Sequence, residues 1–339
     1  MLGLIPGMPN LVFITISAAI GYAAFHIYKK QLREEAFVEP EPIVQDISDE
    51  PKELTWEDVA PVDMIGLEVG YRLIPLVDKT QGGELMSRIK GVRKKLSQEL
   101  GFLIPPVHIR DNLDLSPNMY RLTLMGVNIG EIEIHPDREM AINPGQVFGE
   151  VQGIATQDPA FGLDAVWIEN NQKDQAQTYG YTVVDPGTVV ATHLSQVIQT
   201  HAHELLGHEE VQQMLDTLKK SAPKLVEDLV PETLSLGAVV KVLQNLLQES
   251  IPVRDMRTIA ETLIEHGVVS QDTGALTAAV RISLGRSIVQ KISGLDKELS
   301  VITLEPDLER LLQQSLQASE DGGAGLEPGL AERMIKALE

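Results

Sequence analysis

Residues 83–101 read GELMSRIKGVRKKLSQELG, and this stretch indicates the fold class of the chain. Its apolar residues recur every three or four positions, which predicts a helix with one buried face, and Gly101 is the expected C-cap. A strand is predicted on either side, over Val69–Val77 and Val107–Arg110. With the strands that follow, the predicted order of the first folded unit is β-α-β-β-β. The apolar residues of the helix are Leu85, Ile89, Val92, Leu96 and Leu100.

The chain after this unit predicts more strands and then a helical region. Residues 120–125 and 129–134 alternate as two strands joined at Gly126-Val127-Asn128. Asp185 and Pro186 suit the first positions of a helix that runs to about Leu206. The other predicted elements are an irregular, Gly-rich stretch at 140–162, a strand at 165–168, a helix at 172–179 ended by Gly180, a strand at 181–184, and a bundle of helices with apolar stripes over 211–218, 239–247, 256–263 and 276–292.

The C-terminal stretch predicts a unit that is cut short. Residues 300–304 read as a strand, residues 306–317 as a helix, and residues 329–338 as the beginning of another helix. Because a lone strand with an exposed edge is not stable by itself, we expect this last unit to be incomplete.

The N-terminal stretch predicts a membrane helix. Residues 11–27 read LVFITISAAIGYAAFHI without Asp, Glu, Lys or Arg, and about 17–20 such residues span a bilayer core. Lys29, Lys30 and Arg33 follow, which places the rest of the chain in the cytoplasm. A signal peptide is one alternative, but residues 1–10 lack its basic region. A buried core helix is the other, and the basic stop and the acidic tail argue against it.

Residues 31–60 are expected to form an acidic linker. Seven Asp and Glu residues between positions 34 and 50 are interleaved with prolines, and such a segment is extended and self-repelling. Trp56 is an isolated aromatic residue in this segment. Two interpretations stay open for it, a local anchor on its own domain or a contact with a neighbouring subunit, where aromatic residues are enriched.

The charge of the chain restricts its partners. The formal net charge is −21 at pH 7, so repulsion argues against nucleic acid and anionic lipid headgroups as partners. The chain has no Cys, which fits a reducing compartment. The predicted helix at 83–100 is basic, unlike the acidic chain around it. We interpret its basic side as a solvated face, and binding of an acidic partner is the alternative. Its basic residues are Arg88, Lys90, Arg93, Lys94 and Lys95.

One stretch, THAHELLGH at residues 200–208, has features of a metal site. A zinc protease helix needs two His residues at i and i+4 on one face, whereas His203 and His208 are five positions apart and diverge around a helix. His201 and His208 share a face but lack an evident third ligand. We therefore expect no metal, no cofactor and no catalytic residue, with a metal-dependent hydrolase that uses this His cluster as the alternative function.

Several segments together resemble the FlhA family, the large inner-membrane components of flagellar type III protein export, with their injectisome relatives. The likeness covers nearly the whole chain in the same order, and the flagellar branch is the closer one. The segments are residues 6–10 (PGMPN), 66–75 (GLEVGYRLIP), 107–112 (VHIRDN), 158–168 (DPAFGLDAVWI), 189–194 (VVATHL), 243–247 (LQNLL) and 254–258 (RDMRT).

The resemblance implies an α+β fold class with several subdomains. One N-terminal transmembrane helix (residues 1–30) and the acidic linker (31–60) come first. Subdomain 1 is a discontinuous α/β unit at 61–136 and 186–205, into which a ferredoxin-like subdomain 2 at 137–185 is inserted. Subdomain 3 is helical at 206–285, and subdomain 4 is an incomplete α/β unit at 286–339.

The resemblance also implies a function without enzymatic activity. The bulk of the chain would be the cytoplasmic docking platform of the flagellar type III export gate at the bacterial inner membrane. It would assemble as a nonameric ring, meet other export-apparatus proteins including the ATPase complex, bind export chaperones with their substrates, and order export. The implied chaperone- and substrate-binding residues are Asp158, Phe161 and Thr192, and the implied inter-subunit linker contacts are Glu53, Trp56 and Asp58.

Two arrangements are open for the docking residues. In the first, Phe161 is an apolar anchor, Asp158 accepts hydrogen bonds at the rim, and the helix residues Val189, Val190 and Leu194 form an aliphatic wall near Thr192. In the second, Phe161 packs in the core and Asp158 caps a local turn.

Overall fold

The computed structural model describes residues 21, 22, 25, 62–78, 84–294, 301, 303–306, 308–310, 312–313, 329 and 336. The chain divides into two units, Met1–Pro61 and Val62–Glu339. The expected membrane span at 11–27 is described only at Gly21, Tyr22 and Phe25, which are helical. The linker at 31–60 lies outside the described residues. The strand expected at 300–304 is wrong at its described positions 301, 303 and 304, which belong to no strand, whereas the described positions within 306–317 are helical. Among the described residues, no helix combines the length and apolar composition needed to cross a bilayer.

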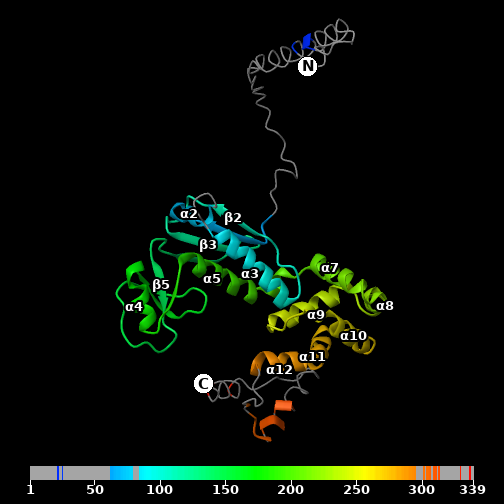
Figure 1. Cartoon of the computed structure of the whole chain (residues 1–339). Coiled ribbons are helices and arrows are strands. Elements are labelled where there is room, and N and C mark those ends of the chain that lie inside the picture. Colours follow the sequence, from blue (N-terminus) through cyan, green and yellow to red (C-terminus); the bar gives the residue numbers. More distant parts are fainter. Residues whose placement is uncertain are drawn as a thin grey trace, which may run out of the picture. The chain divides into compact units, whose positions relative to one another are not determined.

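The first sheet is built around a strand–helix–strand unit (Figure 1). Strand β1 (Ile65–Val69) pairs in parallel with β2 (Val107–Asp111), and the helix α3 (Leu85–Leu100) makes the crossover that parallel strands need. Strands β3 (Met119–Leu124) and β4 (Val127–Glu133) add antiparallel pairs, so the order is β2-β1-β3-β4. Helix α3 ends at Gly101, whose φ of 99° is the left-handed cap expected from the sequence.

The strand expected over Val69–Val77 is wrong. Strand β1 ends at Val69, and a 3-10 turn (η3, Tyr71–Leu73) and a short helix (α2, Ile74–Val77) follow. The chain turns at Gly70, where a side chain would lie 2.7 Å from the carbonyl oxygen of Pro117. Pro75 then lies in the first turn of α2, where its missing N–H has no helical partner to lose.

The expected hairpin is present with a shifted turn. The turn consists of Met125 and Gly126, which have φ values of 47° and 79°, and two positive φ values are typical of the tight turns that join two strands. The predicted turn at Gly126-Val127-Asn128 therefore begins one residue too late.

The second sheet has the order β6-β7-β5-β8, and all its pairs are antiparallel. Its strands are β5 (Glu139–Ile142), β6 (Ile154–Gln157), β7 (Asp164–Ile168) and β8 (Thr182–Val184), with a 3-10 turn (η5, Asn170–Gln172) and the helix α4 (Lys173–Thr178) between the last two. The irregular stretch expected over 140–162 thus contains two strands. Strand β5 does not alternate because Met140 and Ala141 are both buried, and β6 does not because it is mostly exposed.

Helix α5 (Pro186–Thr200) returns the chain from the second sheet to the side of α3 (Figure 1). As predicted, Asp185 is its N-cap, accepting a hydrogen bond from the Thr188 backbone N–H at 3.1 Å, and Pro186 is its first residue. Met140 and Trp167 join the main core on one face of the second sheet. Ala141 and Ile168 pack with Ala176 of α4 on the other face. The predicted helix to Leu206 breaks at His201 into α5 and α6 (Ala202–Leu205).

The remaining described region is a set of helices that share the main core. The fourth apolar stripe, over 276–292, was predicted to lie on one helix, and this is wrong. The backbone leaves helical geometry at Leu284, and a new helix begins at Gly285. The elements are α7 (His208–Lys219), α8 (Pro223–Glu227), η6 (Asp228–Thr233), α9 (Leu236–Gln248), α10 (Met256–Gly267), α11 (Thr273–Ser283) and α12 (Gly285–Ser293).

Candidate functional site

The candidate docking residues come from two elements. Asp158 and Phe161 lie in the loop between β6 and β7, and Thr192 lies in α5. We call residues 158–163 the docking loop. Glu53, Trp56 and Asp58, the expected inter-subunit contacts, lie outside the described residues.

The docking loop is held by its own backbone. The Asp158 N–H donates to the Leu163 carbonyl at 2.8 Å, and the Gly162 N–H donates to the Asp158 carbonyl at 2.8 Å. The Asp158 side chain accepts a further hydrogen bond from the Phe161 N–H at 2.9 Å. Gly162 has a φ of 69°, which a residue without a Cβ adopts at no cost. These contacts fix the backbone that carries Phe161.

Phe161 and Asp158 have opposite environments. The Phe161 side chain is 63% exposed, and the neighbouring Leu163 is 40% exposed, so Phe161 does not pack in the core. Asp158 is only 3% exposed, and its carboxylate binds the loop that contains it. Phe161 therefore has the exposed position expected in the first arrangement. Asp158 instead caps the local turn, as in the second arrangement, and does not lie at an exposed rim.

The prediction of an aliphatic wall beside the docking loop is wrong. Val189, Val190 and Leu194 are 2%, 1% and 0% exposed, because they point from α5 into the main core. Thr192, on another side of α5, is half-buried. Exposed apolar surface near the docking loop comes instead from Phe161 and Leu163 within it.

Tyr120 of β3 and His193 of α5 form a buried polar pair. The Tyr120 hydroxyl and His193 Nδ1 are 2.8 Å apart, and the two rings meet edge to face. Burial raises the pKa of Tyr120, and the charge of Asp158 raises it further. Burial lowers the pKa of His193, and the charge of Asp158 partly opposes this shift. At neutral pH His193 is therefore neutral, and Tyr120 keeps its proton.

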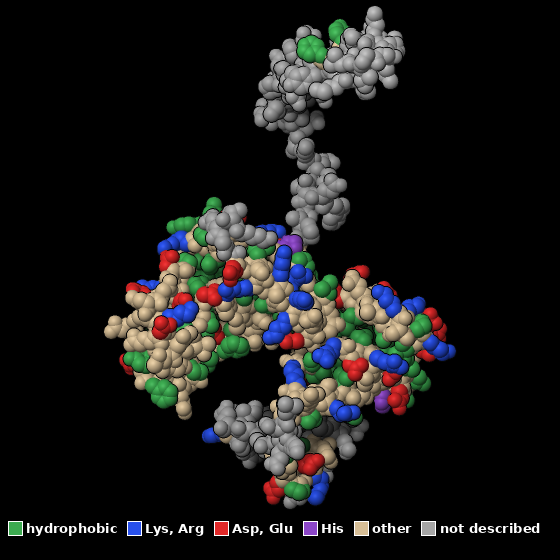
Figure 2. Space-filling model, viewed as in Figure 1, with side chains coloured by type: hydrophobic (Ala, Val, Ile, Leu, Met, Phe, Trp, Pro, Cys, Tyr) green, Lys and Arg blue, Asp and Glu red, His purple; other side chains and the backbone are tan. Residues whose placement is uncertain are grey.

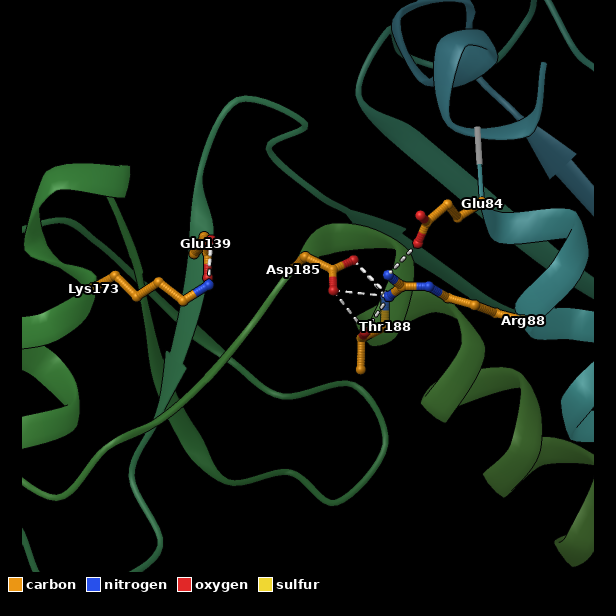
Figure 3. A network of polar contacts seen from close by, with 6 residues as sticks. All are labelled: Glu84, Arg88, Glu139, Lys173, Asp185 and Thr188. Carbon is orange, nitrogen blue, oxygen red and sulfur yellow. Dashed lines mark hydrogen bonds and ion pairs between the residues drawn. The ribbon is translucent and has the colours of Figure 1, made fainter. Parts of the chain in front are cut away.

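An ion-paired network joins α3 to the start of α5 (Figure 3). Arg88 Nη1 lies 2.7 and 2.8 Å from the two carboxylate oxygens of Asp185 and also donates to the Thr188 hydroxyl. The hydrogen bond to Asp185 raises the pKa of Arg88. Burial works to raise the pKa of Asp185, but hydrogen bonds from Arg88 and Thr188 outweigh it and hold that pKa below its ordinary value. In the second sheet, Lys173 of α4 similarly donates to Glu139 of β5 at 2.9 Å.

The basic residues of α3 divide into two groups. Arg88 binds Asp185, and Arg93 donates to the carbonyl oxygens of Ile104 and Pro105, at 2.8 Å each. Lys90, Lys94 and Lys95 are exposed. Figure 2 shows Lys and Arg side chains gathered over the region that α3 occupies in Figure 1. Only the lysines therefore match the predicted solvated face, and the two arginines are structural.

The His cluster does not form a metal site. His201 Nδ1 lies 2.7 Å from Glu204 Oε1, and His208 begins a different helix from the one that contains His203. In the part of the chain that the structure describes, no group of three His, Asp or Glu side chains is placed to hold a metal ion. The alternative of a metal-dependent hydrolase has no support in these residues.

Comparison with known sequences gives matches over the whole chain. A family model described as the FHIPEP family matches residues 1–339. Flagellar biosynthesis protein FlhA of Escherichia coli (strain K12) is 52% identical over 335 residues, which are 99% of this chain and 48% of that protein. The protein of the same name from Bacillus subtilis (strain 168) is 41% identical over 278 residues, 82% of this chain and 41% of that protein. The chain spans about half the length of the curated relatives it matches.

Solved structures show the same fold. The Chlamydia pneumoniae CdsV protein is 28% identical, with a TM-score of 0.67 over 76% of this chain and 77% of that one. A structure described as the Chlamydia pneumoniae CdsV and CdsO protein complex gives 26% identity and a TM-score of 0.71 over 83% of this chain and 84% of that one. Nonameric EPEC SctV-C, at 21% identity and a TM-score of 0.66 over 83% of each chain, shows the fold alone.

Proposed function

The chain belongs to the FHIPEP family, and from this premise we propose that its Val62–Glu339 unit is a docking platform of a flagellar type III protein export gate. The platform binds export chaperones with their substrates and orders export across the bacterial inner membrane. It has no enzymatic role. Residues 1–30 anchor it in that membrane, and the bulk of the chain lies in the cytoplasm.

The observation that carries this proposal is the exposed Phe161 on a fixed loop. An aromatic side chain that is 63% exposed on a hydrogen-bonded backbone can enter a partner's pocket without first being ordered. Phe161 stands beside a second exposed apolar residue, Leu163. A partner with an apolar pocket fits this surface better than a charged ligand does.

The proposal extends to the arrangement of subdomains. We assign subdomain 1 to residues 61–136 and 186–205, because α5 returns to α3 after the second sheet. The order β6-β7-β5-β8 with antiparallel pairs is the one expected for a ferredoxin-like subdomain 2 at 137–185. Helical residues 206–285 and the stretch 286–339 are the third and fourth subdomains.

The proposed assembly is a ring of nine copies, which also meets other export-apparatus proteins, including the ATPase complex. Glu53, Trp56 and Asp58 contact the neighbouring copy in this proposal. It rests on the family resemblance, since these residues lie outside the described part of the chain.

The substitution Phe161→Ala tests the proposal. The purified chain is titrated with a flagellar chaperone–substrate complex, and the melting temperature is measured in parallel. Truncating an anchor in a binding hot spot costs about 2 kcal/mol or more, some thirtyfold in affinity. A buried Phe→Ala costs roughly 3–5 kcal/mol of stability, but Phe161 is mostly exposed. We expect lost affinity with nearly native melting.

Phe148→Ala is the matched control. Phe148 is 87% exposed in the loop between β5 and β6, outside the docking loop. It should change neither affinity nor melting. Unchanged affinity in folded Phe161→Ala, or an equal loss in Phe148→Ala, would contradict the proposed site.

A further inference from the structure

We propose that the free edge of strand β6 (Ile154–Gln157) binds an extended segment of the exported substrate, which adds to the second sheet as a further strand. The inference deepens the proposed docking function and rests on it. It assigns a binding mode to the substrate itself, through backbone hydrogen bonds made next to the aromatic contact at Phe161.

The outer edge of β6 presents backbone groups that the described part of the chain leaves unpaired. Strand β6 is the last in the order β6-β7-β5-β8, and it pairs only with β7. The Asp158 N–H donates to the Leu163 carbonyl at 2.8 Å, which makes this pair a hydrogen-bonded one. Because hydrogen-bonded pairs alternate along an antiparallel ladder, the next residues of β6 that bond to β7 are 156 and 154. The N–H and C=O groups that point away from β7 are those of Ala155 and Gln157.

Among the described strands, the other sheet edges are protected against a further strand and β6 is not. Natural edge strands avoid unwanted pairing by charges, prolines, bulges or very short length. Strand β2 carries Arg110 and Asp111, β4 carries Glu131 and Glu133 and a shift in register, and β8 has only three residues. Strand β6 reads IATQ, without charge or Pro, and its pairing with β7 is prolonged by the bond at Asp158. This edge is therefore suited to pairing.

The free edge is continuous with the docking loop. Gln157, the last residue of β6, directly precedes Asp158. At the start of the strand Ile154 is 43% exposed, and after its end Phe161 and Leu163 are 63% and 40% exposed. A segment laid along β6 therefore meets apolar side chains at both ends and backbone donors and acceptors between them.

An unfolded segment of the substrate fits this edge better than a folded chaperone does. A folded protein already pairs most of its backbone groups internally, whereas an unfolded segment has them free and becomes ordered on binding. In recognition by strand addition, main-chain hydrogen bonds supply affinity and alternate side chains supply specificity. Since β6 offers no charge, we expect the bound segment to be uncharged and rich in β-branched or aromatic residues.

Hydrogen exchange at the Ala155 and Gln157 amides tests the inference in the unmodified chain. Exchange is measured for the chain alone, with a purified flagellar chaperone, and with the same chaperone bound to its substrate. We expect exchange at both amides to slow by about tenfold or more only with the chaperone–substrate complex. Equal protection by the chaperone alone overturns the inference, as does a complex that binds without protecting these amides.

The substitution Ala155→Pro tests the same edge by affinity. It removes an N–H that points away from β7, and Pro is tolerated at such positions of edge strands. We expect affinity for the chaperone–substrate complex to weaken about tenfold, as for the loss of one backbone hydrogen bond. Ala155→Val is the matched control, because it keeps the N–H, and its affinity should be unchanged. Equal affinities of the two folded variants overturn the inference.

Failure of this inference differs from failure of the docking proposal. Lost binding by Phe161→Ala, together with unprotected Ala155 and Gln157 amides in the native complex, overturns only the inference. Normal binding by Phe161→Ala overturns the docking proposal, even where Ala155→Pro weakens binding. If Ala155→Pro does not fold, the exchange measurement on the unmodified chain decides.

Discussion

Gly101 holds the end of α3 against the segment that leads into α10, and replacing it tests the packing between them. Its φ is 99°, and a Cβ at this position would lie 2.7 Å from Arg254 Cβ and closer still to the Arg254 backbone. The adjacent Val253 N–H donates to the Leu100 carbonyl at 2.8 Å. Gly101→Ala must therefore strain its own backbone and push Arg254 away.

The expected cost is the sum of two effects. A residue with a Cβ in left-handed geometry costs roughly 1–2 kcal/mol. Displacing Arg254 far enough to remove the overlap breaks the neighbouring hydrogen bond, worth about 1 kcal/mol. A total of about 2–3 kcal/mol corresponds to a melting temperature lower by about 4–12 °C for a folded region of this size.

Two further glycines separate these effects. Gly145 has a φ of 115° with nothing within 4 Å of a Cβ, so Gly145→Ala carries the conformational cost alone. Gly91 lies within α3 with the same open space, and Gly91→Ala should stabilise the chain by up to about 1 kcal/mol. Urea denaturation should rank stability as Gly91→Ala, unmodified chain, Gly145→Ala, Gly101→Ala. Equal losses for the last two would refute the proposed clash with Arg254.

The remaining predictions concern titratable groups. Arg88→Gln should cost about 1 kcal/mol, because both ion-pair partners are partly exposed. The pKa of Asp185 is held below its ordinary value of about 4, so this stabilisation is present above pH 4 and lost as pH falls through the lower, folded value. Denaturation midpoints of the unmodified chain and of Arg88→Gln, measured at pH 7 and in acid, check this. The same difference between the two midpoints at both pH values would contradict it. Burial lowers the pKa of His193, so its contribution to stability falls as pH drops below about 6.5, the unfolded value. The melting-temperature difference between the unmodified chain and His193→Asn should shift in favour of Asn between about pH 7.5 and pH 5.5; a parallel pair of curves would contradict it.

Sequence patterns predicted the elements that have one buried face. Helix α3 with its cap at Gly101, the β3–β4 hairpin, the N-cap Asp185 and the helices α7, α9 and α10 follow from local periodicity and capping. Strands β5 and β6 were missed, because one is buried on both faces and the other is mostly exposed. The turn after β1 was missed for a different reason: the backbone approach that needs Gly70 comes from residues 116 and 117.

The candidate site was predictable only in part. Family resemblance supplied Asp158, Phe161 and Thr192, but residue type gave no means to decide between an exposed anchor and a core aromatic for Phe161. The structure shows by exposure alone that Phe161 is not a core aromatic. Tyr120 and His193 carry no local signal, since 73 positions separate them in the sequence and only the packing of α5 brings them together. A buried Tyr–His contact of this kind has no sequence spacing that could reveal it.

The docking loop is defined by its own hydrogen bonds. The chain leaves the first sheet after β4, builds the second sheet, and returns through α5, so this loop belongs to the segment inserted between β4 and α5. Apolar contacts such as Met140 and Trp167 hold the sheets together without fixing the loop. Directional hydrogen bonds can specify one placement where apolar contacts tolerate several. Placing the Asp158 carboxylate under the loop therefore trades burial of a charge for a defined position of the Phe161 backbone, the residue proposed as the docking anchor.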